Sequence, residues 1–160
     1  MKNRIPYLII SVLLIIIGFL TFNMFNAISF SKLNTENLSY VQTSLSNNTG
    51  QLIWYTLGLG ALPFLLLITK KIAKIESYLR TIIVSLIIFF GGFLFWQIKI
   101  LTTNSAIKTV KKFSVQGVQN SFDVSKVNFS LYLTIGFLLG TIISIIVFKF
   151  LVKKSSNTQE

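Results

Sequence analysis

The chain has 160 residues, of which 52% are apolar and 12% are charged, whereas soluble domains carry about 25% charged residues. Its 15 Lys and Arg residues outnumber its 4 Asp and Glu residues and give a formal net charge of +11. This composition excludes an ordinary water-soluble globule. The absence of Cys and His excludes disulfides and removes the commonest general base and the best transition-metal ligands.

The apolar residues fall into four segments, at about 5–25, 52–69, 81–98 and 131–148. None of the four contains Asp, Glu, Lys or Arg, and each is long enough to cross a hydrocarbon core of about 30 Å as a helix. Strands of a soluble sheet are shorter, about five or six residues, and a backbone in lipid must satisfy its own hydrogen bonds, which favours helices. We therefore predict an all-α integral membrane protein, a single domain over residues 1–160 whose four transmembrane helices form a small antiparallel bundle.

The first segment has some features of a secretory signal peptide. It follows the basic residues Lys2 and Arg4, and Ala27 with Ser29 resembles a cleavage site. Its apolar stretch is longer than the roughly 7 to 15 residues of such peptides. We therefore expect it to remain as a transmembrane helix, with cleavage as the alternative.

The second segment follows a polar stretch, 31–51, that we predict to be an outer loop rich in Ser, Asn, Thr and Gln. Within the segment, Pro63 follows Gly58 and Gly60. A proline removes one backbone donor and clashes with the carbonyl four residues before it, so we expect a kink near Leu59. Pro63 is thus a hinge candidate, although Pro and Gly are in general more frequent in membrane helices than in soluble ones.

A second outer loop is expected over 101–130, after the third segment. Lys108, Lys111 and Lys112 are interleaved there with apolar residues, which predicts a short basic amphipathic turn of helix at a membrane surface. Residues 113–124 approximate strand alternation and indicate a small hairpin. The three lysines are candidate contacts for an acidic partner, anionic lipid or an envelope polyanion; the alternative is a solvated connector.

The fourth segment carries small residues at every fourth position, Gly136, Gly140 and Ser144. Helices in lipid associate where small residues let their backbones approach. The stripe predicts a helix-packing face. We expect contact with another helix of the same chain, with a homodimer seam as the alternative.

The basic residues indicate the orientation. Nine of the 15 precede the first segment, link the second to the third, or follow the fourth: Lys2, Arg4, Lys70, Lys71, Lys74, Arg80, Lys149, Lys153 and Lys154. The positive-inside rule then places both termini, including a tail at 149–160, in the cytoplasm, with the protein in the plasma (bacterial cytoplasmic) membrane. Trp54, Trp96 and Tyr132 would form an aromatic belt at the opposite interface.

The chain has few side chains of the kinds that catalysis needs. The four acids, Glu36, Glu76, Asp123 and Glu160, lie in separate loops or at the terminus, and no Asp, Glu, His, Lys or Arg lies inside the four segments. Proton-coupled carriers carry such residues at membrane depth. We expect no enzymatic activity, no cofactor and no metal site. We also expect no nucleic-acid binding, because the cations are divided between two sides of the membrane.

Two functional classes remain. The first is a non-catalytic membrane protein that acts by contact, as an accessory subunit of an envelope complex or as an immunity-type protein. The second is an oligomeric pore-forming, holin-like or channel-like protein. In either class, the partners of this protein would be membrane lipids and either another membrane protein or further copies of itself. The lack of charge at membrane depth favours the first class.

Overall fold

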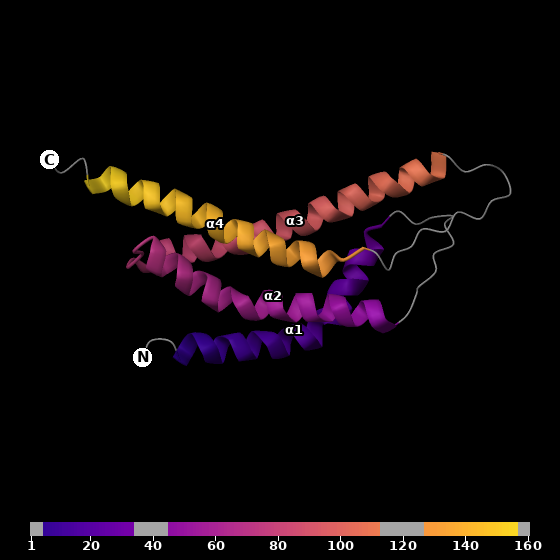
Figure 1. Ribbon diagram of the computed structural model, residues 1–160, viewed down its shortest axis with the longest axis horizontal. Coiled ribbons are helices and arrows are strands. Elements are labelled where there is room, and N and C mark those ends of the chain that lie inside the picture. Colours follow the sequence, from indigo (N-terminus) through magenta and orange to yellow (C-terminus); the bar gives the residue numbers. More distant parts are fainter. Residues whose placement is uncertain (1–4, 34–44, 113–126, 157–160) are drawn as a thin grey trace.

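Four long helices make up the protein in a computed structural model, which describes residues 5–33, 45–112 and 127–156 (Figure 1). They are α1 (Ile5–Ser31), α2 (Leu45–Ile72), α3 (Tyr78–Lys112) and α4 (Phe129–Ser156). The helices alternate in direction, so that the start of α1, the end of α4 and the link between α2 and α3 lie at one end of the molecule (Figure 1). We call this the terminal end. The opposite end, where α1 and α3 finish and α2 and α4 begin, is the loop end.

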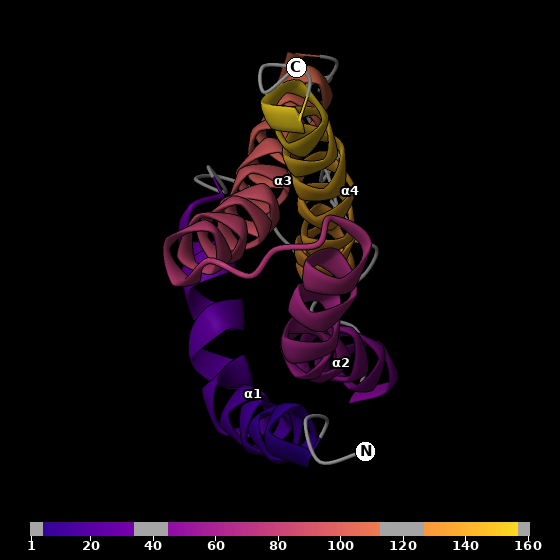
Figure 2. The ribbon, with the colours of Figure 1, turned by 90° about the vertical axis from the view of Figure 1, so that its left-hand side faces the viewer.

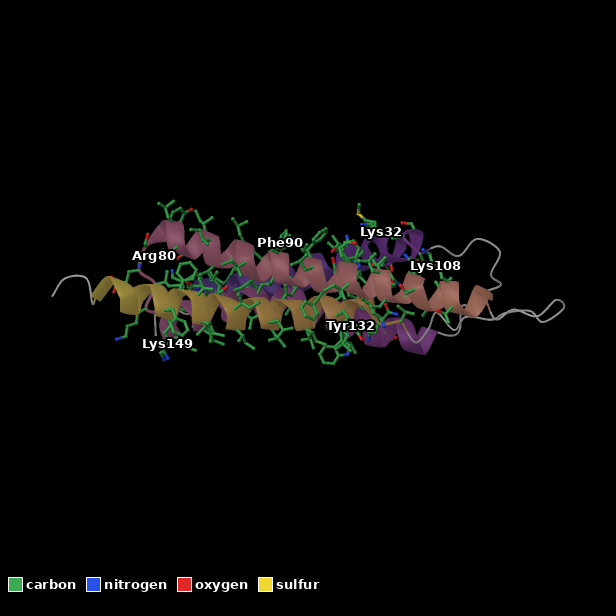
Figure 3. All side chains as sticks on the ribbon, turned by 90° about the horizontal axis from the view of Figure 1, so that it is seen from above. Lys32, Arg80, Phe90, Lys108, Tyr132 and Lys149 are labelled. Atoms are coloured by element: carbon green, nitrogen blue, oxygen red, sulfur yellow. The ribbon has the colours of Figure 1, made fainter. Side chains whose placement is uncertain are left out.

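All four helices are long enough and apolar enough to cross a membrane. The prediction of an all-α protein with four membrane-spanning helices is therefore confirmed. Large apolar side chains such as Leu20, Phe90 and Ile142 are exposed along the bundle, and in Figure 3 Phe90 lies between two ends that carry the labelled cations. Lipid tails are as apolar as Leu, so such a surface is stable in a bilayer and unstable in water.

The helices are longer than the predicted spans. α3 has 35 residues, roughly 50 Å at 1.5 Å per residue, against a hydrocarbon core of about 30 Å. The segment 101–130 expected as an outer loop is helical as far as Lys112, and the last residues of the expected loop 31–51 belong to α2. No Gly or Pro interrupts 99–112, so the backbone ladder continues past the apolar span. The hairpin expected at 113–124 lies outside the described residues.

The packing order differs from the chain order. α1 packs on α2, α2 on α4, and α4 on α3, while α2 touches α3 less extensively. Viewed from the terminal end, α1 stands apart from the start of α3 (Figure 2). The bundle is therefore closed by α4 rather than by a contact between α1 and α3 along their length.

The link between α2 and α3 is a compact helix end. Lys74 adopts a left-handed conformation with φ 49°, and Ile75 N donates to the carbonyl oxygen of Lys70 over 3.0 Å. This is the pattern of a Schellman cap, which satisfies a carbonyl at the end of a helix. Ile75 and Ala73 are buried, so the link is packed against the bundle and holds α2 and α3 antiparallel.

Candidate functional site

The predicted helix-packing stripe lies against α3. A Cβ atom added to Gly136 would lie 2.5 Å from the carbonyl oxygen of Gly91, and one added to Gly140 would lie 2.9 Å from that of Ile87. Real Cβ atoms essentially never come within 3.0 Å of other atoms, so the two backbones are in contact as small-residue packing requires. Ser144, one turn further on, is fully buried. The stripe thus contacts a helix of the same chain.

Pro63, the hinge candidate, is buried within α2. The helix bends between its middle and its Ile72 end (Figure 1). One turn before the proline, the carbonyl oxygen of Gly60 accepts a hydrogen bond of 2.5 Å from Ser11 Oγ of α1. Neighbouring hydroxyls commonly satisfy backbone groups around a proline in membrane helices. Pro63 therefore sits in a bend that another helix supports.

At the loop end, polar contacts join the end of α1 to α3. Trp96 Nε1 donates to Ser29 Oγ over 2.9 Å, and both side chains are buried. Asn104 Nδ2 donates to the carbonyl oxygen of Lys32 over 3.1 Å, and Lys32 Nζ lies 4.5 Å from the centre of the Trp96 ring. We call these four residues the loop-end cluster. It brings α1 and α3 into contact at the loop end, whereas at the terminal end the two helices stand apart (Figure 2).

The start of α4 is anchored at the same end. Gln51 Nε2 of α2 donates to the carbonyl oxygen of Val127 over 3.1 Å, and Thr134 Oγ1 donates to that of Trp54 over 2.9 Å. Asn128 Oδ1 accepts from the backbone of Leu131 over 2.9 Å, as an N-cap does. These bonds fix where the chain re-enters the bundle.

The lysines predicted to contact a partner lie on the part of α3 that continues beyond the apolar span. Lys108 is exposed, and Lys111 and Lys112 occupy the last turn of α3. The lysines are therefore not on a separate short turn, as the sequence suggested, but on a continuous helix of which one face, Ile100, Thr103 and Ile107, is buried. We call residues 99–112 the α3 extension.

The charge at the loop end is of one sign within the part of the chain that the structure describes. Lys32, Lys99 and Lys108 lie there, and Lys99 Nζ is 4.6 Å from the centre of the Tyr132 ring. In Figure 3 Lys32, Lys108 and Tyr132 lie toward this end, opposite Arg80 and Lys149. Over residues 5–33, 45–112 and 127–156 the one acidic residue is Glu76, at the terminal end. Among the described residues, the α3 extension thus presents positive charge with no acid beside it, and positive charge attracts acidic groups.

Sequence reasoning missed most of the loop-end cluster. It placed Trp96 in an aromatic belt and considered Ser29 only as part of a cleavage site. Ser29 and Trp96 are 67 positions apart, and no local pattern relates them. The N-cap role of Asn128 does have a sequence signal, because Asn is favoured directly before an apolar helical run.

Among the described residues no group of three His, Cys, Asp or Glu side chains could hold a metal ion. That the chain is not an enzyme and takes no cofactor stays a prediction. Comparison of the chain with protein-family models, with curated proteins and with solved structures finds no match.

Proposed function

We propose that this is a non-catalytic membrane protein that acts by contact, and that the α3 extension is the element by which it binds an acidic segment of another envelope protein. An accessory subunit of a membrane complex and an immunity-type protein are both proteins of this kind. The proposal places the partner at the loop end.

The observation that carries it is the construction of the α3 extension. It continues for about 20 Å past the apolar span at 1.5 Å per residue, and α3 reaches further than α2 or α4 at this end (Figure 1). Its buried face, with Ile107 fully inaccessible, holds it against the rest of the protein, while Lys108 is exposed. Lys108 is exposed on a helix whose Ile100, Thr103 and Ile107 are buried, so its charge is presented at a defined position, which favours recognition over mere solvation.

Contact is better supported than permeation. The side chains exposed along the spans are predominantly Leu, Ile and Phe, which do not line an aqueous path. Between α3 and α4 the backbones of Gly91 and Gly136 touch, which leaves no room for a water path at that level of the two helices. An oligomeric pore would need its polar lining on a surface that is instead apolar.

The orientation belongs to the same proposal. We place both termini in the cytoplasm and the α3 extension outside, in a plasma (bacterial cytoplasmic) membrane. The reason is that the densest cations lie at the terminal end, in the link and the helix ends beside it: Lys70, Lys71, Lys74 and Arg80. The partner would then be an outer or laterally bound envelope protein with an acidic segment.

A photo-crosslinking residue incorporated at Ser105, an exposed position one turn before Lys108, tests the contact in native membranes. We expect one heterologous adduct of discrete size, and we expect Lys108→Glu in the same chain to abolish it by reversing the charge at the extension. The matched control is the same crosslinker at Tyr78, which is 78% exposed at the terminal end and should not yield this adduct. Adducts with the chain itself alone, combined with dye release from liposomes that scales with copy number, would favour the pore and refute the contact.

A further inference from the structure

We propose that a groove between α2 and α3 at the terminal end binds one acyl chain of an anionic phospholipid, whose headgroup lies at Lys70. The groove is a pocket of about 510 Å³, and the residues that line it come from these two helices alone. They include Leu62, Leu66, Tyr78, Thr81, Ser85 and Phe89. This site is separate from the α3 extension, which lies at the opposite end of the molecule.

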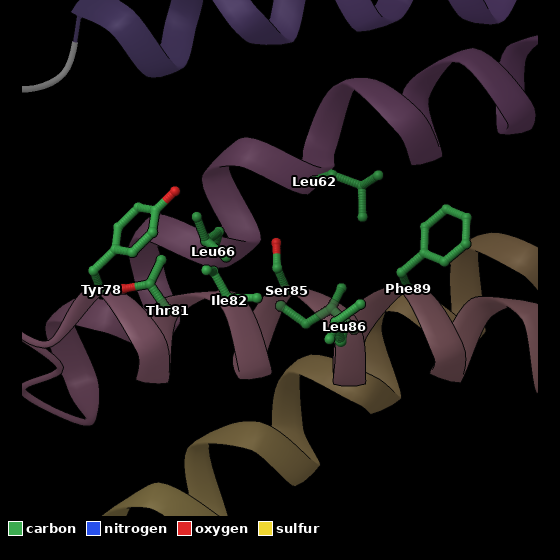
Figure 4. A pocket seen from close by; sticks show the side chains of 9 residues that line it. Leu62, Leu66, Tyr78, Thr81, Ile82, Ser85, Leu86 and Phe89 are labelled. Atoms are coloured by element: carbon green, nitrogen blue, oxygen red, sulfur yellow. The ribbon is translucent and has the colours of Figure 1, made fainter.

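The pocket exists because of two local features. Ser85 has the smallest of the lining side chains, and in Figure 4 its hydroxyl points into the space between α2 and α3. α2 bends at its Pro63 half and converges on α3 toward the link, and α1 stands apart from this part of α3 (Figures 1 and 2). The lining residues include none from α1 or α4, and the pocket is partly open to the surroundings of the bundle.

The length of the groove matches one leaflet. Its lining runs along α3 from Tyr78 to Phe89, a separation of eleven residue steps, which at 1.5 Å per residue is about 16 Å. Half of a hydrocarbon core of about 30 Å is about 15 Å. The deep part, with Leu62 and Phe89, is apolar, while the hydroxyls of Tyr78 and Thr81 lie toward the mouth (Figure 4). The groove is thus apolar at one end and polar at the other, in the same order as the acyl chain and the headgroup of a phospholipid.

Several cations follow the lining residues of α2 along the chain toward the terminal end. Lys70 comes four residues after Leu66 on α2, so the two share a face of the helix, and Lys70 is half-buried. Lys71, Lys74 and Arg80 lie nearby in the chain, against the single acid Glu76. Cations between helices at the cytoplasmic side are typical of sites for acidic lipid headgroups. The charge therefore selects an anionic lipid over a zwitterionic one.

The size of the pocket argues for an acyl chain rather than a helix of a partner protein. A helix segment 16 Å long and about 10 Å across occupies roughly 1,200 Å³, more than twice the pocket volume. A single hydrocarbon chain is thin enough to enter the groove lengthwise. We therefore assign the groove to a lipid of the surrounding bilayer.

The test measures lipid binding to the full chain in detergent by native mass spectrometry. Dioleoyl phosphatidylglycerol and dioleoyl phosphatidylcholine are titrated separately, and the complex with one lipid is quantified. We expect the wild type to prefer phosphatidylglycerol. Because one cation near the surface changes anionic-lipid affinity about fivefold, we expect Lys70→Gln to weaken phosphatidylglycerol binding about fivefold and leave phosphatidylcholine unchanged. Lys149→Gln removes the same charge at the same end from α4, and it should change neither.

The apolar part has its own pair of variants. Ser85→Phe should reduce binding of both lipids at least tenfold by filling the groove, whereas Ile83→Phe, on an exposed position of α3 outside the lining, should not. Equal affinity of the wild type for the two lipids overturns the proposal, as does a Lys149→Gln effect as large as that of Lys70→Gln. If Ser85→Phe does not fold, the comparison of Lys70→Gln with Lys149→Gln decides the matter alone.

Discussion

Trp96 of α3 donates its indole hydrogen to the hydroxyl of Ser29 at the end of α1, over 2.9 Å and within a buried site. Ser29 Oγ in turn donates to the carbonyl oxygen of Phe25 over 2.8 Å. The hydroxyl is thus both acceptor and donor, and it links the backbone of one helix to the side chain of another. This bond is part of what closes the bundle at the loop end.

Breaking that bond should loosen the loop end. Ser29→Ala leaves the indole hydrogen of Trp96 without its acceptor in a buried site, at a cost of about 1 to 3 kcal/mol. We expect a lower free energy of unfolding in a denaturing-detergent titration followed by circular dichroism. Ser31→Ala is the control, because Ser31 is exposed and its hydroxyl donates only to Ile28 of the same helix. An equal effect of the two substitutions would show that the bond contributes nothing specific.

The α3–α4 contact depends on glycine. Gly140→Ala places a methyl group 2.9 Å from the carbonyl oxygen of Ile87, and overpacking of this kind costs about 1 to 3 kcal/mol. Gly50 has nothing within 4 Å of an added Cβ, so Gly50→Ala should be neutral or stabilising by up to about 1 kcal/mol. Thermal unfolding in the same detergent measures both. Tolerance of Gly140→Ala would contradict the close approach of the two backbones.

Ser11 supports the bend in α2. Ser11→Ala removes the donor to Gly60, and interhelical hydrogen bonds in membranes average about 0.6 kcal/mol with a maximum near 1.7. We expect a loss in this range, measured by the same unfolding titration. Ser105→Ala, at an exposed position of α3, should leave stability unchanged. If Ser11→Ala matches that control, the hydroxyl does not stabilise the bend.

The orientation can be measured because the chain has no cysteine. We expect Ser105→Cys, at the loop end, to react with a membrane-impermeant maleimide in intact cells. Ser77→Cys, in the link at the terminal end, should react only after the membrane is permeabilised. Both positions are exposed, so accessibility within the protein does not limit the reaction. Labelling of both from outside would break the four-span arrangement, and the reverse pattern would invert the topology.

The sequence by itself determined the number of spans, their alternation and the packing role of small residues. Four segments without charge exist because a charged side chain in the middle of a membrane helix costs about 2.5 to 3.5 kcal/mol. The recurrence of Gly136, Gly140 and Ser144 predicts a close helix contact, because positions four apart share a helix face. These features depend on local composition, which can be read along the chain.

Only the tertiary structure decided which helices meet and where α3 stops. The stripe on α4 contacts Gly91 and Ile87 of α3, and Ser29 of α1 contacts Trp96 of α3. Both contacts depend on the angles at which the helices cross. Those angles depend in turn on all the side chains at each contact. The length of α3 could not be predicted from the sequence, because hydropathy indicates where the membrane span ends and not where the helical hydrogen bonding ends. Lys108 therefore lies on a long helix rather than in a loop. The burial of the neighbouring Ile107 fixes that helix in place.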